Sequence, residues 1–192
     1  MSETAPVPAL VLVDVDGVIR ALGDTVADLE HWPAESWQRN RVAIRWAGFT
    51  VTVTHSTAVI DRLRRIEAMP HTAMTWCTSW RNDAAASLAP VIGLGEDWPI
   101  VGHDLPEELQ WTGWWKAARV YEATRTHKRV VWVDDDAARW VEKMRAAELG
   151  EWLNWLDERV LIISPDRRRG LTSEHLDAIE NFLAPGASEV TE

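Results

Sequence analysis

The sequence predicts an α/β fold in which helices cover both faces of a central parallel sheet. Short apolar runs of about five residues alternate along the chain with segments of helical periodicity, which is the pattern of βαβ units. The apolar runs contain few polar positions, so each predicted strand should be buried on both faces. Three of these runs end directly in polar residues, and in such sheets ligands bind beyond the carboxyl ends of the strands.

Size and composition favour one domain. A chain of 192 residues suits a single domain with a small insertion, and its net charge of −10 argues against strong nonspecific binding to nucleic acid or anionic membranes. The single cysteine, Cys77, cannot form an internal disulfide, the first residues lack the basic region of a secretory signal, and no apolar run is long enough to span a bilayer. We expect a cytoplasmic protein that does not enter membranes. Most of its thirteen tryptophans should pack the core or cover helices.

The first third of the chain contains a buried strand and the insertion. Five apolar residues at 9–13 predict the strand. In the insertion, residues 20–55, apolar and polar positions alternate on both sides of Gly48 and predict a β-hairpin over residues 41–54.

The remaining elements follow from the same criteria. Ser56 is the predicted N-cap of a helix that ends near Ala68. Further helices are predicted at 81–90, 113–124, 137–148, 151–157 and 172–183, strands at 72–78, 129–133 and 159–164, a loop at 91–112 with a short strand at 99–101, and a disordered tail from about 185.

The most informative stretch is the end of the first strand, Asp14-Val-Asp16-Gly17. Residues alternate sides along a strand, so Asp14 and Asp16 should share a face, and Gly17 lets the backbone turn away after them. Two carboxylates ~4 Å apart repel by about 4 kcal/mol at an effective dielectric near 20. The pair therefore predicts either a Mg²⁺ site or a shared proton. An ordinary Asp-Gly turn is the simpler alternative. A calcium loop of the EF-hand type is excluded, because Val18 stands where an oxygen ligand is required.

Other polar residues follow the second and third strands. Thr78 and Ser79 come after the second strand and Asp134-Asp135 after the third, so these side chains should meet Asp14 at one edge of the sheet. Carboxylates are also favourable in the first turn of a helix, so Asp134 and Asp135 have two candidate roles, capping the next helix and binding a metal.

Together these residues resemble the four motifs of the haloacid dehalogenase (HAD) superfamily of phosphatases, in the family's order: Asp14-Val-Asp16-Gly17, Thr78, Lys116 and Asp134-Asp135. Four motifs in order at strand ends are more specific than any one of them. A receiver domain of the two-component type gathers similar residues, but it requires the lysine last. Here Lys116 precedes the acid cluster.

The resemblance covers about residues 9–183 and implies one HAD-like domain. Its three-layer, Rossmann-like core would comprise residues 9–19 and 56–183, with 20–55 as a small hairpin flap or cap. Within the superfamily, the W-x-T-x-W pattern at 76–80 and the Trp132-Val-Asp-Asp-Asp136 run are most similar to HAD domains of bacterial RNA repair proteins.

The resemblance also implies roles for the acids. Asp14 would be the nucleophile that forms an aspartyl phosphate, a known covalent route for carboxylates. Asp16 would protonate the leaving oxygen and then activate water. Mg²⁺ would take Asp14, the backbone carbonyl of Asp16, and Asp134 or Asp135 as ligands.

The remaining residues would bind phosphate and substrate. Thr78 and Lys116 would stabilise the transferring phosphoryl group. Ser79, Arg81 and Arg167 are candidate substrate-binding residues, and His55 is a further candidate for specificity. The predicted activity is Mg²⁺-dependent hydrolysis of a phosphorylated small molecule, nucleotide or nucleic-acid end. The alternative is a catalytically inactive HAD-fold module that binds a protein partner.

Overall fold

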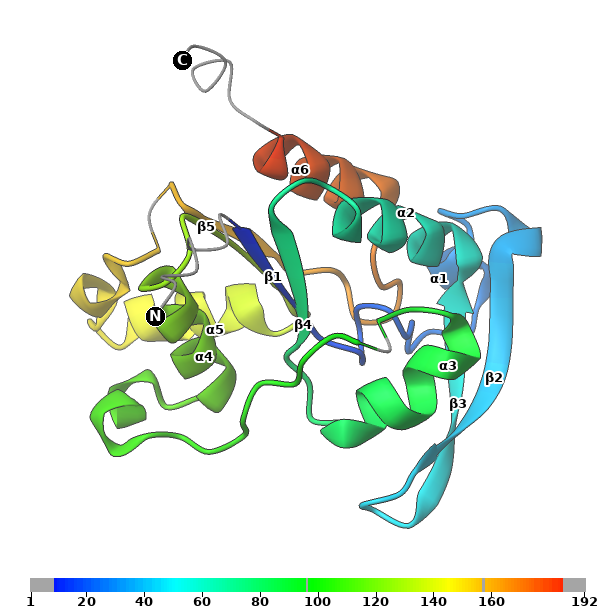
Figure 1. Ribbon diagram of the computed structural model, residues 1–192, viewed down its shortest axis with the longest axis horizontal. Helices are drawn as coiled ribbons and strands as arrows, with labels where there is room; N and C mark the ends of the chain where they lie inside the picture. The colour runs from blue at the N-terminus through cyan, green and yellow to red at the C-terminus, as the bar shows by residue number, and fades with distance from the viewer. Residues whose placement is uncertain (1–8, 96, 157, 185–192) are drawn as a thin grey trace, which may run out of the picture.

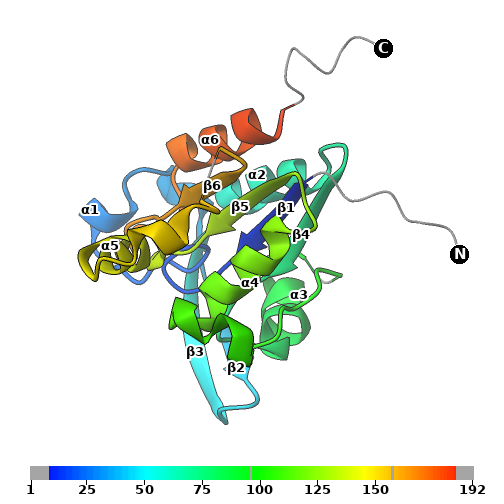
Figure 2. The same cartoon turned by 90° about the vertical axis from the view of Figure 1, so that its left-hand side faces the viewer.

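A four-stranded parallel sheet forms the centre of the computed structural model, which describes residues 9–95, 97–156 and 158–184. The strands lie in the order β4, β1, β5, β6 (Figures 1 and 2). Their bounds are Thr72–Trp76 for β4, Ala9–Val13 for β1, Arg129–Val133 for β5 and Val160–Ile163 for β6. The predicted α/β fold with a parallel sheet is confirmed.

The register of the sheet aligns the ends of its central strands. Val13, the last residue of β1, lies opposite Trp76 of β4 and Val133 of β5. The residues that follow these three strands therefore leave the sheet at the same edge, as the sequence predicts.

Helices cover both faces of the sheet. Helices α2 (Thr57–Glu67) and α6 (Ser173–Leu183) lie on one face, and α4 (Trp115–Thr124) and α5 (Ala137–Ala146) lie on the other (Figures 1 and 2). The N-cap predicted at Ser56 is confirmed, because its hydroxyl accepts a hydrogen bond from the Ala58 amide at 3.2 Å.

Each face of the sheet contributes to a separate hydrophobic core. Val11 and Val13 pack into the core beneath α2 and α6, whereas Leu12 and Trp132 pack beneath α4 and α5. This alternation follows from the two-residue period of a strand. Many of the tryptophans are buried, as expected: Trp76, Trp80, Trp98, Trp132, Trp140 and Trp155.

The insertion forms a hairpin that packs beside the sheet. After the short helix α1 (Val26–Leu29), β2 (Trp37–Ile44) pairs antiparallel with β3 (Phe49–Ser56). The hairpin is longer than the predicted 41–54, because polar residues at the start of β2 continue the pairing. Gly48 lies in the turn with φ +72°, a conformation that favours glycine.

Three irregular segments differ from the prediction. The helix expected at 81–90 contains a π-helical turn at Ala84–Leu88 before α3 (Ala89–Ile92), where Pro90 has no amide hydrogen to continue the α-helical pattern. The helix expected at 151–157 is a 3₁₀ turn, Gly150–Leu153. The strand expected at 99–101 is a single bridge from Ile100 to Trp76.

The described residues contain no helix with the length and apolar character needed to cross a bilayer. The tail predicted to be disordered from about residue 185 lies outside the described residues.

Core packing should dominate stability. Leu63 of α2 is fully buried, and truncating such a leucine removes apolar contacts and leaves a cavity. We expect Leu63→Ala to lower the free energy of unfolding by about 2–5 kcal/mol in urea denaturation. The matched variant Leu149→Ala removes an exposed leucine and should change it by less than about 0.5 kcal/mol. Equal losses of unfolding free energy in the two variants would contradict the assignment of Leu63 to the core.

Candidate functional site

Three carboxylates from two strand ends converge at one edge of the sheet. Asp14 follows β1, and Asp134 and Asp135 follow β5, its neighbour. One oxygen from each lies within 4.8 Å of the others. Asp14 and Asp134 are buried, so water screens their charges poorly. An arrangement of this kind requires compensating positive charge.

Lys116 supplies part of that charge. It lies in the first turn of α4, and its ammonium Nζ is 2.6 Å from Oδ2 of Asp14 and 2.6 Å from Oδ2 of Asp134. The indole rings of Trp114 and Trp115 lie near the same ammonium, with centroids at 5.6 and 5.8 Å. Burial alone would lower the pKa of Lys116, but the two carboxylates outweigh it and raise the pKa. The lysine is therefore positively charged at neutral pH.

The pKa values of the three acids are raised, chiefly by burial. Burial raises the pKa of Asp14, and the opposing effects of Lys116, the Thr78 hydroxyl and the Val15 amide do not cancel it. Burial and the charge of Asp14 raise the pKa of Asp134 to about 7. Burial, followed by the charges of Asp136 and Asp14, raises that of Asp135 to about 6. One lysine therefore does not neutralise the charge of three carboxylates.

Gly17 makes room for Asp135. A Cβ atom at position 17 would lie 2.5 Å from Cγ of Asp135, and Gly17 has a φ of +72° that other residues rarely adopt. Any side chain here would displace the acid. The glycine predicted to turn the chain after the acid pair therefore also permits the close approach of the two strand ends.

The carboxylate of Asp16 lies outside the cluster of three acids. It accepts hydrogen bonds from Nη1 of Arg20 at 2.8 Å and from the indole Nε1 of Trp80 at 2.9 Å. Strand β1 ends at Val13, so the alternation expected of a strand does not extend to Asp16. The prediction assigns the backbone carbonyl of Asp16 to the metal, and this stays a prediction.

Thr78 is fully buried after β4, with its hydroxyl close enough to Asp14 to affect the pKa of that acid. Its carbonyl oxygen lies 2.6 Å from Nε2 of His103, whose ring packs against Trp115 at a centroid distance of 4.4 Å. His103 lies in a segment of weak periodicity, and no sequence signal indicates its role. Thr78, Asp14 and Lys116 do meet, as predicted.

The predicted substrate-binding residues have different surroundings. Ser79 is exposed and lines a hollow with Asp16. Arg81 has φ +55° and holds its guanidinium 4.9 Å from the centroid of the Trp46 ring. Arg167 is exposed, with Nε 3.5 Å from Oδ2 of Asp135. Of these residues, Arg167 contacts an acid of the cluster, whereas Ser79 and Arg81 lie on the side of Asp16 and Trp46.

His55 is only 3% exposed, and burial lowers its pKa. The idea that His55 contributes to specificity is thus disfavoured, because a buried ring cannot contact substrate.

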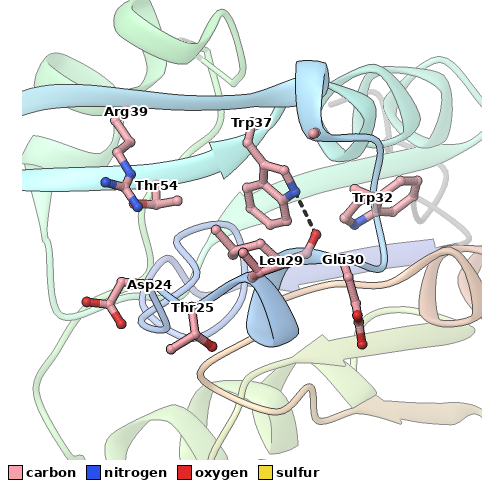
Figure 3. Close-up of a pocket in the computed structure, with 10 residues that line it drawn as sticks. Asp24, Thr25, Leu29, Glu30, Trp32, Trp37, Arg39 and Thr54 are labelled. Carbon is pink, nitrogen blue, oxygen red and sulfur yellow. Dashed lines mark hydrogen bonds between the residues drawn. The ribbon is translucent and has the colours of Figure 1, made fainter.

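A separate hollow of about 360 Å³ lies within the insertion, between α1 and β2 (Figure 3). Trp32, Leu29 and Trp37 line it, and the Trp37 indole donates a hydrogen bond to the Leu29 carbonyl at 2.8 Å. None of the predicted site residues is among the described residues that line this hollow, so we assign it no part in the proposed reaction.

The donor set of the acid cluster fits Mg²⁺. Mg²⁺ prefers carboxylate oxygens, retains waters, and is commonly held by one or two carboxylates plus a phosphate of the substrate. Asp14, Asp134 and Asp135 offer oxygens from one place, and a divalent cation would offset the charge that Lys116 leaves uncompensated.

No protein-family model, curated protein or solved structure matches this chain.

The raised pKa of Asp134 predicts how stability depends on pH without metal. An acid whose pKa rises from 3.8 to about 7 on folding stabilises the fold at low pH. This contribution is lost as the pH rises from about 4 to about 7. We expect the unfolding free energy of the protein, minus that of Asp134→Asn, to fall between about pH 4 and 7 and then level off. Urea denaturation in EDTA measures it, and a difference that increases with pH would contradict the raised pKa.

Proposed function

We propose that this protein is a Mg²⁺-dependent phosphohydrolase of the HAD type that acts through an aspartyl-phosphate intermediate. The observation that carries the proposal is the cluster of the buried Asp14 and Asp134 with the half-buried Asp135, with the Lys116 ammonium 2.6 Å from the two buried acids. In this proposal the acids serve as nucleophile and metal ligands, and Lys116 supplies a fixed positive charge.

Asp14 would act as the nucleophile. One of its oxygens forms a bond to phosphorus while the bond from phosphorus to the ester oxygen breaks, and the leaving oxygen takes a proton from Asp16. Asp16 then removes a proton from a water molecule, which attacks the phosphorus. This second step releases inorganic phosphate and regenerates the Asp14 carboxylate.

Lys116 and Thr78 would stabilise the transferring group. Its negative charge is spread over three equatorial oxygens, so fixed donors aimed at them lower the barrier. The Lys116 ammonium is buried, and two carboxylates orient it before any substrate arrives. The Thr78 hydroxyl lies beside the same nucleophile. Mg²⁺, held by Asp14 and by Asp134 or Asp135, would supply Lewis-acid stabilisation of the phosphoryl oxygens.

Asp16 is held apart from the nucleophile, and in this proposal the two acids take different roles. Arg20 and Trp80 fix its carboxylate on the side of the hairpin turn, in the hollow that Ser79 also lines. Two acids from one strand end thus have different partners. This difference in environment is how neighbouring carboxylates divide nucleophilic and acid–base roles.

The hairpin β2–β3 would serve as a small flap in a single HAD-like domain. Such a flap leaves the site open, which favours nucleotides or terminal phosphates of nucleic acids among the candidate substrates, with Arg81 and Arg167 as contacts for phosphate. The resemblance to HAD domains of RNA repair proteins supports the same substrates.

The nucleophile gives the most direct test. We expect the protein to hydrolyse p-nitrophenyl phosphate in Mg²⁺, and Asp14→Asn to lower kcat by roughly a thousandfold or more, because the amide cannot form the acyl phosphate. Asp61→Asn, an exposed acid on α2, is the matched control and should retain full activity. Full activity in Asp14→Asn, or in excess EDTA, would overturn the proposal.

Metal binding can be tested without turnover. If Mg²⁺ reaches about one hundred times its Kd, it should stabilise the fold by about 2.7 kcal/mol. Asp135→Asn should abolish most of this gain, since it removes one oxygen donor of the cluster. Asp136→Asn should retain it, because Asp136 lies outside the cluster and pairs with Arg139. Thermal unfolding with and without MgCl₂ measures the gain, and equal losses in the two variants would contradict the assigned ligands.

A further inference from the structure

Two aromatic side chains at the hairpin turn are exposed beside the site. Trp46 is 56% exposed and Phe49 is 55% exposed, and they flank the turn that joins β2 to β3. Exposed aromatic rings that lie close together and face a catalytic cleft are candidate contacts for a ligand.

A hollow of about 130 Å³ connects these rings to Asp16. Trp46, Phe49 and Trp80 line it together with Asp16 and Ser79. An engineered apolar cavity of ~150 Å³ holds one benzene molecule, so this hollow is comparable in size to a single aromatic ring.

The walls of the hollow are preorganised. The backbone amide of Trp46 donates a hydrogen bond to Oδ2 of the buried Asp83 at 3.3 Å, which anchors the turn to the core. The Arg81 guanidinium lies 4.9 Å from the Trp46 ring centroid, and the Trp80 indole is fixed by its hydrogen bond to Asp16. Rings that are already positioned bind a ligand at a lower entropic cost.

The chemistry of the hollow favours an uncharged, flat group. Among the described residues that line it, Arg20 is the only cation, and its guanidinium pairs with Asp16. Ile44 and Val51 complete an apolar wall. Among the described residues that line the hollow, a phosphate would find only the paired Arg20, whereas an aromatic ring would find apolar and aromatic surface.

We propose that this hollow binds the leaving group, and that Trp46 and Phe49 select phosphomonoesters whose leaving group carries an aromatic ring. The inference rests on the proposed function, because the leaving oxygen must lie next to Asp16 if Asp16 protonates it. The ring would then occupy the space between Asp16 and the hairpin turn, while the phosphoryl group lies at Asp14.

The test compares an aryl with an alkyl phosphate. The preference is the ratio of kcat/KM for phenyl phosphate to kcat/KM for ethyl phosphate. The two esters differ in intrinsic reactivity, but this difference is the same for every variant, so it drops out when the ratio is compared between variants. We expect Trp46→Ala and Phe49→Ala each to reduce this preference by about tenfold, with little change for ethyl phosphate. Trp46→Phe retains a ring and should restore most of it.

Trp152→Ala is the matched control, because it removes a similarly exposed tryptophan, 48% exposed, that does not line the hollow. It should leave the preference unchanged. If Trp46→Ala lowers kcat/KM equally for both esters, or lowers it for neither, the inference is overturned.

A binding measurement separates this inference from the proposed function. If the wild-type protein hydrolyses neither ester, the proposed function fails, and calorimetry with phenylphosphonate and ethylphosphonate in Mg²⁺ then tests the hollow directly. Tighter binding of phenylphosphonate that is lost in Trp46→Ala would support the aromatic subsite, and equal affinities in the wild-type protein would refute it.

Discussion

The contact of Lys116 with two buried carboxylates organises the site. Asp14, Lys116 and Asp134 come from the end of β1, from α4 and from the end of β5, so their ion pairs join three elements that are distant in sequence. Burying charges is costly unless they are paired, and here one ammonium faces three acids. Burial, joined at Asp134 and Asp135 by the charges of neighbouring acids, keeps the pKa values of the acids raised. The negative charge that Lys116 leaves uncompensated makes the site suitable for a divalent cation.

The same cluster explains the conformation of its surroundings. Gly17 lacks the Cβ that would displace Asp135. Strand β1 ends before Asp16, whose carboxylate contacts Trp80 and Arg20 instead of the other acids. Two acids separated by one residue thus have unlike environments: one is in a charged cluster, and the other borders a hollow walled by aromatic rings. If Asp14 is the nucleophile and Asp16 the proton donor, their environments must differ in this way.

Local sequence patterns were sufficient for the regular elements of the fold. The buried strands are continuous apolar runs, and α2 begins at Ser56, whose side chain caps the helix. The irregular segments were not predictable in this way. The π turn before Pro90 and the 3₁₀ turn at Gly150–Leu153 depend on small differences in hydrogen bonding, which periodicity does not encode. The polar start of β2 pairs only because β3 lies opposite.

Local periodicity and the positions of the strand ends were sufficient to predict the α/β class, the parallel sheet and the order in which acids, threonine and lysine follow its elements. Which atoms meet is set by tertiary packing. Lys116 and Asp14 are 102 positions apart, and their 2.6 Å contact depends on how α4 packs against the sheet. The contact of His103 with Thr78, the turn of Asp16 toward Trp80 and the position of Trp46 depend likewise on long-range packing. No local pattern specifies such contacts, because the free energy that fixes them comes from the folded chain as a whole.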